Sequence, residues 1–224
     1  MTAVHFAIAS ARSEPHAAAP TLVFRVVAEE PSGASIQAAL LRCQVYIDVR
    51  HRRYSLTEGE RLSEVVGHRA RWKDTMTPLL WATVPVVLSR CHGTVELDLP
   101  ISCSYDFEVA SAKYLRALDD GEIPLVFMFS GTIFYGGRSG VRMSQLPVDT
   151  ETSFRLPLDS WREAMSQHFG DSTWIRLDRQ GFDALDRVRR LRGFVTWNQV
   201  VEAVCAECIE ADPLAWLRLG PEVL

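Results

Sequence analysis

The only Cys-x-x-Cys motif of the chain lies near its C-terminal end, at Cys205 and Cys208. Two thiolates at this spacing bind zinc or take part in disulfide exchange. A zinc site takes four ligands, however, and the chain has neither a second Cys-x-x-Cys nor a His-x-x-x-His. The pair also falls inside a segment with helical periodicity. We therefore favour packing of these cysteines in a helix and keep metal binding or redox chemistry as the alternative.

Two further motifs have the composition of a functional loop. Gly136-Gly137-Arg138-Ser139-Gly140 is rich in glycine, but the residues after it look extended, whereas a phosphate loop leads into a helix. We expect a hairpin turn there. Ser130 stands between aromatic residues without the exposed elbow and histidine partner that a nucleophile needs. We therefore assign no catalytic residue and no cofactor-binding residue, and expect no cofactor.

A site assembled from distant strands would leave no local motif, so an enzyme remains the alternative. Its candidate acid–base groups stand near predicted strand ends, at His51, His68, Asp106 and Glu108. None of them forms a recognisable catalytic pattern with a neighbour.

Basic residues are interleaved with aromatic ones in two clusters, residues 50–54 and 68–73, a pattern that suits phosphate backbones. The segment between the clusters is acidic, with Glu58, Glu60 and Glu64, and we expect ion pairs instead. The whole chain has a formal net charge of −4, which argues against a dedicated nucleic-acid binder.

Alternation of apolar and polar residues predicts most of the elements that must position these groups. The clearest case is residues 39–50, with Leu41, Cys43 and Val45 on one face. Proline lacks a ladder donor, so Pro85 predicts an edge or bulged strand at residues 79–88. Gly131 indicates a bulge or a close approach of another backbone. The predicted strands are residues 21–29, 39–50, 79–88, 94–105 and 152–158, with a central hairpin at 123–146.

Helices are predicted mainly after the strands. Thr57 and Glu60 fit a capping box, Asp159 or Ser160 starts a helix ending near His168, and Asp178 starts another that stops at Gly193. A second capping box at residues 196–199 opens the last helix. Tryptophans near these helix starts, Trp161, Trp174 and Trp197, are expected to clamp the helices onto the sheet, with a peptide groove as the alternative.

Strands followed by helices predict an α+β fold, a mainly antiparallel β-sandwich or twisted sheet with a C-terminal helical segment packed on it. We expect a flexible arm at residues 1–20, because residues 9–20 are small and broken by proline, and a single domain at 21–224. That domain divides into a β-rich body (21–158) and a helical tail (159–224).

Five cysteines and a chain of 224 residues, long enough for a full core, favour a reducing compartment. The N-terminal residues make a poor signal peptide, and no apolar stretch is long enough to span a bilayer. We expect a cytoplasmic protein.

Several segments carry a family resemblance: Arg52-Arg53-Tyr54, Glu60-Arg61-Leu62, Arg71-Trp72, the run from Pro124 to Tyr135, and Leu156-Pro157-Leu158 before Trp161-Arg162. From about residue 22 to residue 208 the chain resembles an uncharacterised, mainly actinobacterial family with a domain of unknown function. Some members are encoded near uptake nickel–iron hydrogenase genes. The resemblance implies an accessory role near a hydrogenase and supplies no functional residues.

The leading hypothesis is a non-enzymatic accessory or binding protein, such as an assembly factor or scaffold for a larger bacterial enzyme. A long sheet with edge strands and many aromatic residues is suited to gripping another chain by strand addition. Pairing of the same edge in a homodimer is a second way to cover it. A metal-handling protein using Cys205 and Cys208 is the minor alternative.

Overall fold

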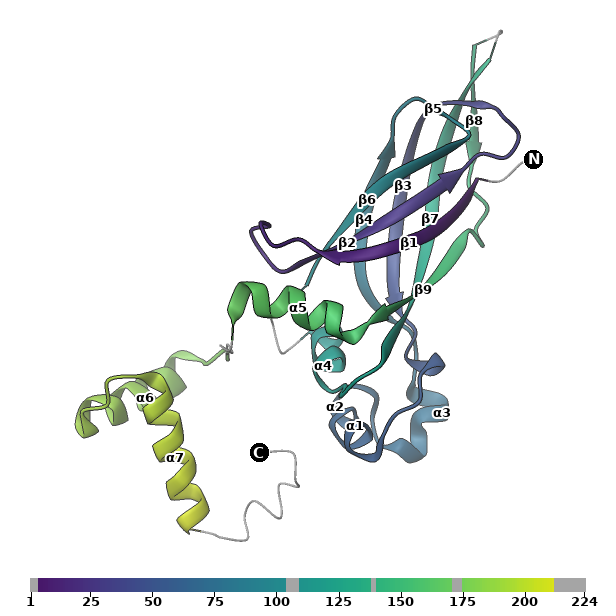
Figure 1. Ribbon diagram of the computed structural model, residues 1–224. Coiled ribbons are helices and arrows are strands. Elements are labelled where there is room, and N and C mark those ends of the chain that lie inside the picture. Colours follow the sequence, from purple (N-terminus) through teal and green to yellow (C-terminus); the bar gives the residue numbers. More distant parts are fainter. Residues whose placement is uncertain (1–3, 104–108, 138–139, 171–174, 212–224) are drawn as a thin grey trace. The chain divides into compact units, whose positions relative to one another are not determined.

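The computed structural model describes residues 4–103, 109–137, 140–170 and 175–211. The described residues fall into two compact units, divided between residues 173 and 174. The first unit holds all the described strands, in two antiparallel sheets (Figure 1). The three-stranded sheet has the order β1 (His5–Ser13), β2 (Thr21–Glu29) and β6 (Thr94–Ser102).

The second sheet has six described strands and follows the order β4-β3-β7-β8. The short β5 extends it beside β3, and β9 pairs with β7 on the part of that strand that β8 leaves free. Its strands are β3 (Ser35–Ile47), β4 (Leu79–Leu88), β5 (Cys91–His92), β7 (Glu122–Gly137), β8 (Gly140–Gln145) and β9 (Glu151–Pro157). The predicted central hairpin is therefore β7–β8, and the edge position of β4, which contains Pro85, is confirmed.

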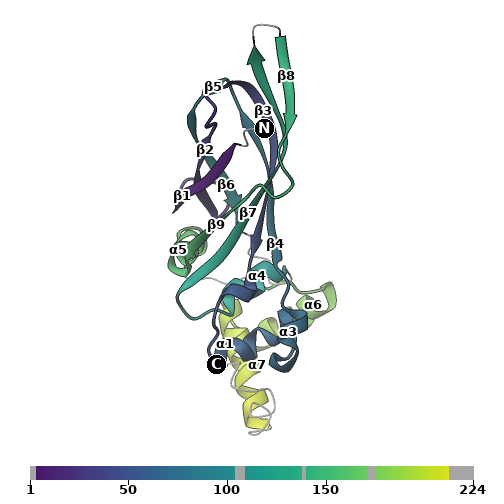
Figure 2. The ribbon, with the colours of Figure 1, turned by 90° about the vertical axis from the view of Figure 1, so that its right-hand side faces the viewer.

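The two sheets face one another as layers with the core between them (Figure 2). The alternation read in the sequence decides which side chains enter it: Leu41, Cys43 and Val45 of β3 are all buried. Aromatic rings cross the layer. Phe24 of β2 meets Phe127 of β7 edge-on at 5.1 Å between ring centroids. The predicted α+β fold with mainly antiparallel sheets is confirmed.

Short helices gather after β3 and before β7. They are η1 (Val49–His51), α1 (Leu56–Arg61), α2 (Ser63–Val66), η2 (Arg69–Arg71), α3 (Trp72–Thr75) and α4 (Ala110–Arg116). The predicted capping box is displaced by two residues: Ser55, not Thr57, caps α1 and exchanges bonds with Glu58. Gly67 ends α2 at a positive φ of 77°, a conformation that glycine adopts readily.

Helix α5 (Leu158–Phe169) packs against β1, β2 and β9, so a helix C-terminal to the strands does cover the sheets. Trp161 is buried there, in agreement with its expected role. The helix begins directly after Pro157 without a side-chain cap, so the predicted cap at Asp159 or Ser160 is wrong. Pro157 is both the last residue of β9 and the N-cap residue of α5, with a φ of −56° and a ψ of 131°.

The second unit contains α6 (Arg179–Arg192) and α7 (Trp197–Ala211). Asp178 caps α6 by accepting from the N–H of Gly181, and Gly193 ends it in the left-handed region, both as predicted. Thr196 and Gln199 exchange the bonds of the predicted capping box. Trp197 packs within this unit on Phe182 of α6, with 5.3 Å between ring centroids, and its expected role on the sheet stays a prediction. Trp174 lies outside the described residues.

The N-terminal segment differs most from the sequence-based expectation. Residues 5–13, expected within a flexible arm, form β1 and pair along β2 with one bulge between Ile8 and Ser10. Phe6 is buried and stacks on Phe129 of β7, 4.1 Å between ring centroids. Backbone pairing holds the small residues of β1, whose side chains alone gave little sign of order.

Candidate functional site

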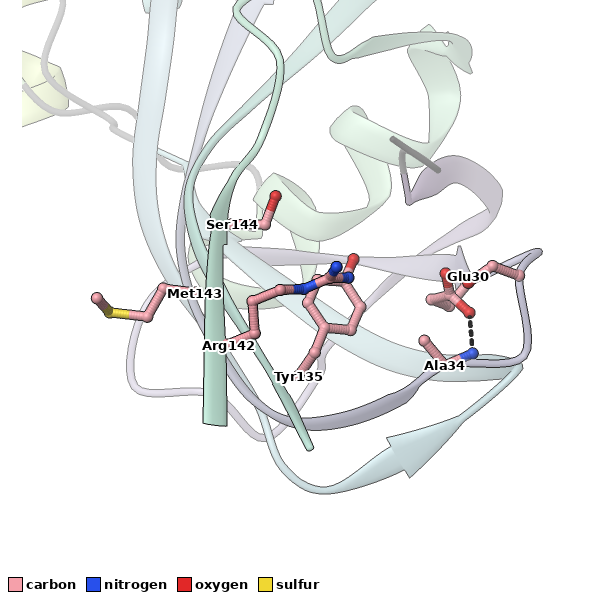
Figure 3. A pocket seen from close by; sticks show the side chains of 7 residues that line it. Glu30, Ala34, Tyr135, Arg142, Met143 and Ser144 are labelled. Carbon is pink, nitrogen blue, oxygen red and sulfur yellow. Dashed lines mark hydrogen bonds between the residues drawn. The ribbon is translucent and has the colours of Figure 1, made fainter. Parts of the chain in front are cut away.

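A hollow of about 420 Å³ opens beside the β7–β8 hairpin, where the turn between β2 and β3 approaches it (Figure 3). Its polar groups come from segments far apart in sequence: Glu30 and Ser32 from the turn, Tyr135 from β7, and Arg142 and Ser144 from β8. Antiparallel pairing sets Arg142 directly opposite Tyr135. The hollow thus depends on the register of β7 with β8.

Glu30 is the buried acid of this hollow, with only 3% of its surface exposed. Its carboxylate accepts from the hydroxyl of Ser32 at 2.5 Å and from the N–H of Ala34 at 2.7 Å. Burial alone would raise the pKa of Glu30, but these donors and the N–H groups of Ser32 and Gly33 outweigh it and hold the pKa below its usual value. Glu30 is therefore an ionised clamp for the turn and is poorly placed to act as a base.

Arg142 is the positively charged residue of the hollow. Its guanidinium lies over the ring of Tyr135, 5.5 Å from the centroid, and Figure 3 shows it pointing toward the side where Glu30 stands. Among the described residues no carboxylate forms an ion pair with Arg142. Burial, reinforced by the charge of Glu30 and opposed by Arg142, raises the pKa of Tyr135, so its phenol stays protonated. The chemistry offered here is binding of an anion and not proton transfer.

Apolar side chains gather on the outer face of the six-stranded sheet. Leu40 of β3 and Val87 of β4 are paired neighbours and are 55% and 67% exposed. On the same face Phe134 of β7 is paired with Met143 of β8, which is also exposed. These four residues are called the outer patch below. Large contiguous apolar patches are uncommon on the surfaces of soluble monomers, whereas single exposed apolar residues are normal.

A second polar cluster lies among the short helices and is fully internal. The guanidinium of Arg52 donates to Glu58 at 2.6 Å, with side chains only 8% and 4% exposed. Burial would raise the pKa of Glu58, but the N–H groups of Asp119 and Ser55 and the charge of Arg52 lower it. Arg52 also donates to the carbonyl oxygens of Asp120 and Glu122. The cluster therefore ties the helical segment to the start of β7.

Two tyrosines complete that internal cluster. The hydroxyl of Tyr54 donates to the carbonyl of Val49 at 2.6 Å, which leaves its oxygen to accept from Tyr114 at 2.9 Å. Burial, partly offset by the bond from Tyr114, raises the pKa of Tyr54 to about 12. Burial and the neighbouring Tyr54 also raise the pKa of Tyr114. Both phenols are structural hydrogen-bonding groups and stay neutral.

The sequence-predicted candidates do not come together. Cys205 and Cys208 are both exposed on α7, so the favoured interpretation of packing is wrong, while their metal or redox role stays a prediction. His51 bonds Asp48 at 2.6 Å, and His68 is exposed before η2. Asp106 and Glu108 lie outside the described residues. No three metal-ligating side chains are grouped in the part of the chain that the structure describes.

The remaining motifs have structural explanations. Ser130 faces outward on β7, and Gly131 beside it has a φ of +136° and leaves room for the backbone of Leu40 and Leu41. Of the glycine run, Gly136 and Gly137 end β7 and Gly140 begins β8, while residues 138 and 139 lie outside the described residues. The basic clusters form the expected ion pair at Arg52 and Glu58, and Arg69 lies over Trp72.

Sequence reasoning missed Glu30, Tyr135 and Arg142 as a group. Glu30 directly precedes Pro31-Ser32-Gly33, a sequence typical of turns, where an acid readily accepts from turn N–H groups. That pattern predicts that Glu30 stabilises the turn, but not that it lies near Tyr135 and Arg142. The proximity of Arg142 required knowledge of the strand register, which the sequence does not supply.

None of the described helices is long and apolar enough to cross a membrane. No curated protein matches the chain. A late embryogenesis abundant protein solved in solution is 15% identical and aligns over 69% of this chain and 71% of its own, with a TM-score of 0.32.

Two β-glucosidases also align with 69% of the chain. The enzyme from Kluyveromyces marxianus in complex with glucose is 9% identical, with a TM-score of 0.26. β-Glucosidase 3B from Thermotoga neapolitana in complex with glycerol is 12% identical, with a TM-score of 0.25. The alignments span only 15% and 17% of those enzymes, and at such TM-scores the likeness carries no argument about fold or function.

A family model, by contrast, accounts for nearly the whole sequence. The model described as "Family of unknown function (DUF6084)" matches residues 1–212, which include both sheets, the hollow and the two C-terminal helices. The chain therefore belongs to the DUF6084 family.

Proposed function

We propose that this protein is a cytoplasmic, non-enzymatic accessory protein that binds another protein through the outer patch. The observation that carries the proposal is the pairing of Leu40 with Val87, two large apolar side chains that stay mostly exposed on a sheet whose other face is buried in the core. A solvated sheet face is normally polar. Apolar pairs on it gain free energy when a partner covers them.

The patch lies on a firm support, which favours recognition. The strand neighbours that point inward from the same two strands are all buried, namely Ala39 and Leu41 of β3 and Val86 and Leu88 of β4. The backbone that carries the outward side chains is thus held in place by the core behind it. A preorganised surface loses little conformational entropy on binding.

The partner class follows from the family resemblance and is part of the proposal. Members of a similar bacterial family stand near uptake nickel–iron hydrogenase genes, so a hydrogenase subunit or one of its assembly proteins is the first partner to test. A second copy of this chain is the competing occupant, because a homodimer would cover the same patch.

The test is quantitative affinity capture from a native lysate of the source organism. We choose the double substitution Leu40→Glu and Val87→Lys, which places opposite charges across the strand pair and so preserves pairing. Val148→Lys is the control, since Val148 is 94% exposed and lies outside the strands.

Capture of a defined partner by the wild type and the control, with at least tenfold less by the double variant, is the expected result. Equal capture by all three proteins contradicts the proposal. A protein that is monomeric by light scattering and captures nothing above background contradicts it as well.

A further inference from the structure

Strand β8 is an open edge of the six-stranded sheet. Among the described strands it pairs only with β7, and β9 continues along β7 beyond it. The backbone N–H and C=O groups on its other side have no strand partner in the described chain. Such an edge is a template for an added strand.

The two faces of β8 differ in chemistry. Arg142 and Ser144 line the hollow from one face of the strand. Val141 and Met143 alternate with them and are exposed, although Met143 also borders the hollow. Figure 3 shows Met143 pointing away from the side on which Arg142 lies over Tyr135. A strand added beside β8 alternates in the same way, with one set of side chains beside Val141 and Met143 and the other at the hollow.

The charge of the hollow determines which side chains of the added strand can be accommodated there. Glu30 has its carboxylate engaged by Ser32 and the turn N–H groups, and no acidic residue among those described pairs with Arg142. The guanidinium is held over Tyr135 and is open to a bidentate carboxylate. An incoming lysine or arginine would be repelled by this cation, while the carboxylate of Glu30 in the same hollow is already engaged by its own turn.

We propose that β8 binds an extended segment of a partner protein in which apolar residues alternate with an aspartate or glutamate that pairs with Arg142. The inference rests on the proposed binding function and names the partner's chemistry at the edge next to the outer patch. A peptide fits better than a free anion because the open backbone edge and the apolar face continue on either side of Arg142.

A second copy of the chain is a poorer occupant of this edge. Antiparallel pairing of two β8 strands with matching faces sets Arg142 of one copy opposite Arg142 or Ser144 of the other. Both registers bring the two guanidinium groups close together, and like charges across strands destabilise the pairing. The charge of Arg142 therefore favours an acidic partner over self-association.

The experiment is selection of a phage-displayed random heptapeptide library on the immobilised full chain. The baits are the wild type, Arg142→Glu and the control Arg155→Glu, which makes the same charge change on β9 at an exposed arginine outside the hollow. We expect the wild type and Arg155→Glu to enrich an acidic residue flanked at alternate positions by apolar ones. Arg142→Glu should enrich lysine or arginine at that position.

One enriched acidic peptide is then measured against the wild type and Arg142→Gln. Its affinity should fall about tenfold when the charged pair is lost. Amide exchange by NMR should slow at β8 in the complex and not at β4.

Failure to enrich any alternating acidic peptide overturns the inference, as does an unchanged profile with Arg142→Glu. If the partner captured through the outer patch binds Arg142→Glu as well as it binds the wild type, the binding function stands and the inference about β8 fails.

Discussion

Arg142 of β8 lies over the ring of Tyr135, its register partner on β7, with the guanidinium carbon 5.5 Å from the ring centroid. Glu30 stands across the same hollow with its carboxylate fully engaged by its own turn. The hollow therefore combines a satisfied acid with a cation that has no acidic partner among the described residues. That imbalance distinguishes it from the Arg52–Glu58 cluster, in which both charges are buried together.

Replacing the buried acid should weaken the fold in a pH-dependent way. Glu30→Gln leaves turn donors without a carboxylate, and we expect a loss of about 1–3 kcal/mol in unfolding free energy at pH 7. The native pKa of Glu30 lies below that of an unfolded glutamate, near 4.3. Glu30 therefore contributes its full stabilisation of the native state above the unfolded pKa, near 4.3. This contribution is lost as pH falls through the lower native pKa of Glu30.

Urea denaturation of both proteins between pH 7 and pH 3 checks this expectation, with the exposed Glu60→Gln as the control. The difference in unfolding free energy between the wild type and Glu30→Gln should become smaller below about pH 4. A gap that stays constant across this range would show that the carboxylate charge contributes nothing.

A methyl group at Gly131 should disrupt the contact between β3 and β7. The added Cβ would stand 2.8 Å from the Cα of Leu41 and closer still to the carbonyl of Leu40, at a φ of +136° that favours glycine. We expect Gly131→Ala to cost about 3 kcal/mol or more or to prevent folding. Gly33→Ala also has a positive φ but meets no atom within 4 Å, so it should cost about 1 kcal/mol. Similar thermal midpoints for the two variants would contradict this.

Removing one charge of the buried pair should cost more than removing both. Arg52→Met leaves Glu58 buried without its cation, and we expect a loss of about 3 kcal/mol. The double variant with Glu58→Gln should recover part of that loss because no uncompensated charge remains. Chemical denaturation of the single and double variants measures the difference, and the exposed Arg53→Met serves as the control. A double variant less stable than Arg52→Met would refute the argument.

The cysteines should separate by reactivity in the native protein. Burial raises the pKa of Cys43 and of Cys103 to about 12, so their thiolates are absent at neutral pH. Cys205 and Cys208 are exposed and should react with a thiol reagent first, with the half-buried Cys91 slower. Mass spectrometry of timed labelling identifies the sites. Elemental analysis of the same protein tests the metal alternative, for which one bound zinc, nickel or iron per chain would be required.

The alternation of side chains made most of the fold predictable. Residues 79–88 were predicted as an edge strand from Pro85, and Asp178 and Gly193 bound a helix as their types indicate. β1 was missed because its small side chains give little periodic signal, although backbone pairing with β2 holds it. The strand propensity of the β1 residues alone does not reveal that β2 is available to pair with them.

The candidate site was not predictable in the same way. Glu30 and Arg142 are separated by more than a hundred residues, and only the pairing of β7 with β8 and the approach of the β2–β3 turn bring them to one hollow. The Cys-x-x-Cys motif, visible at once in the sequence, lies instead on an exposed helix of the second unit. The spacing of residues in the sequence reveals motifs such as Cys-x-x-Cys. The hollow, in contrast, is formed by the pairing register of β7 with β8.

Site-specific photo-crosslinking in cells tests the central claim, that the outer patch binds a partner protein. A photoreactive amino acid at position 87 should give a discrete crosslinked species, identifiable by mass spectrometry, and the same group at position 148 should not. Absence of any crosslink from position 87, or identical products from both positions, would contradict the account.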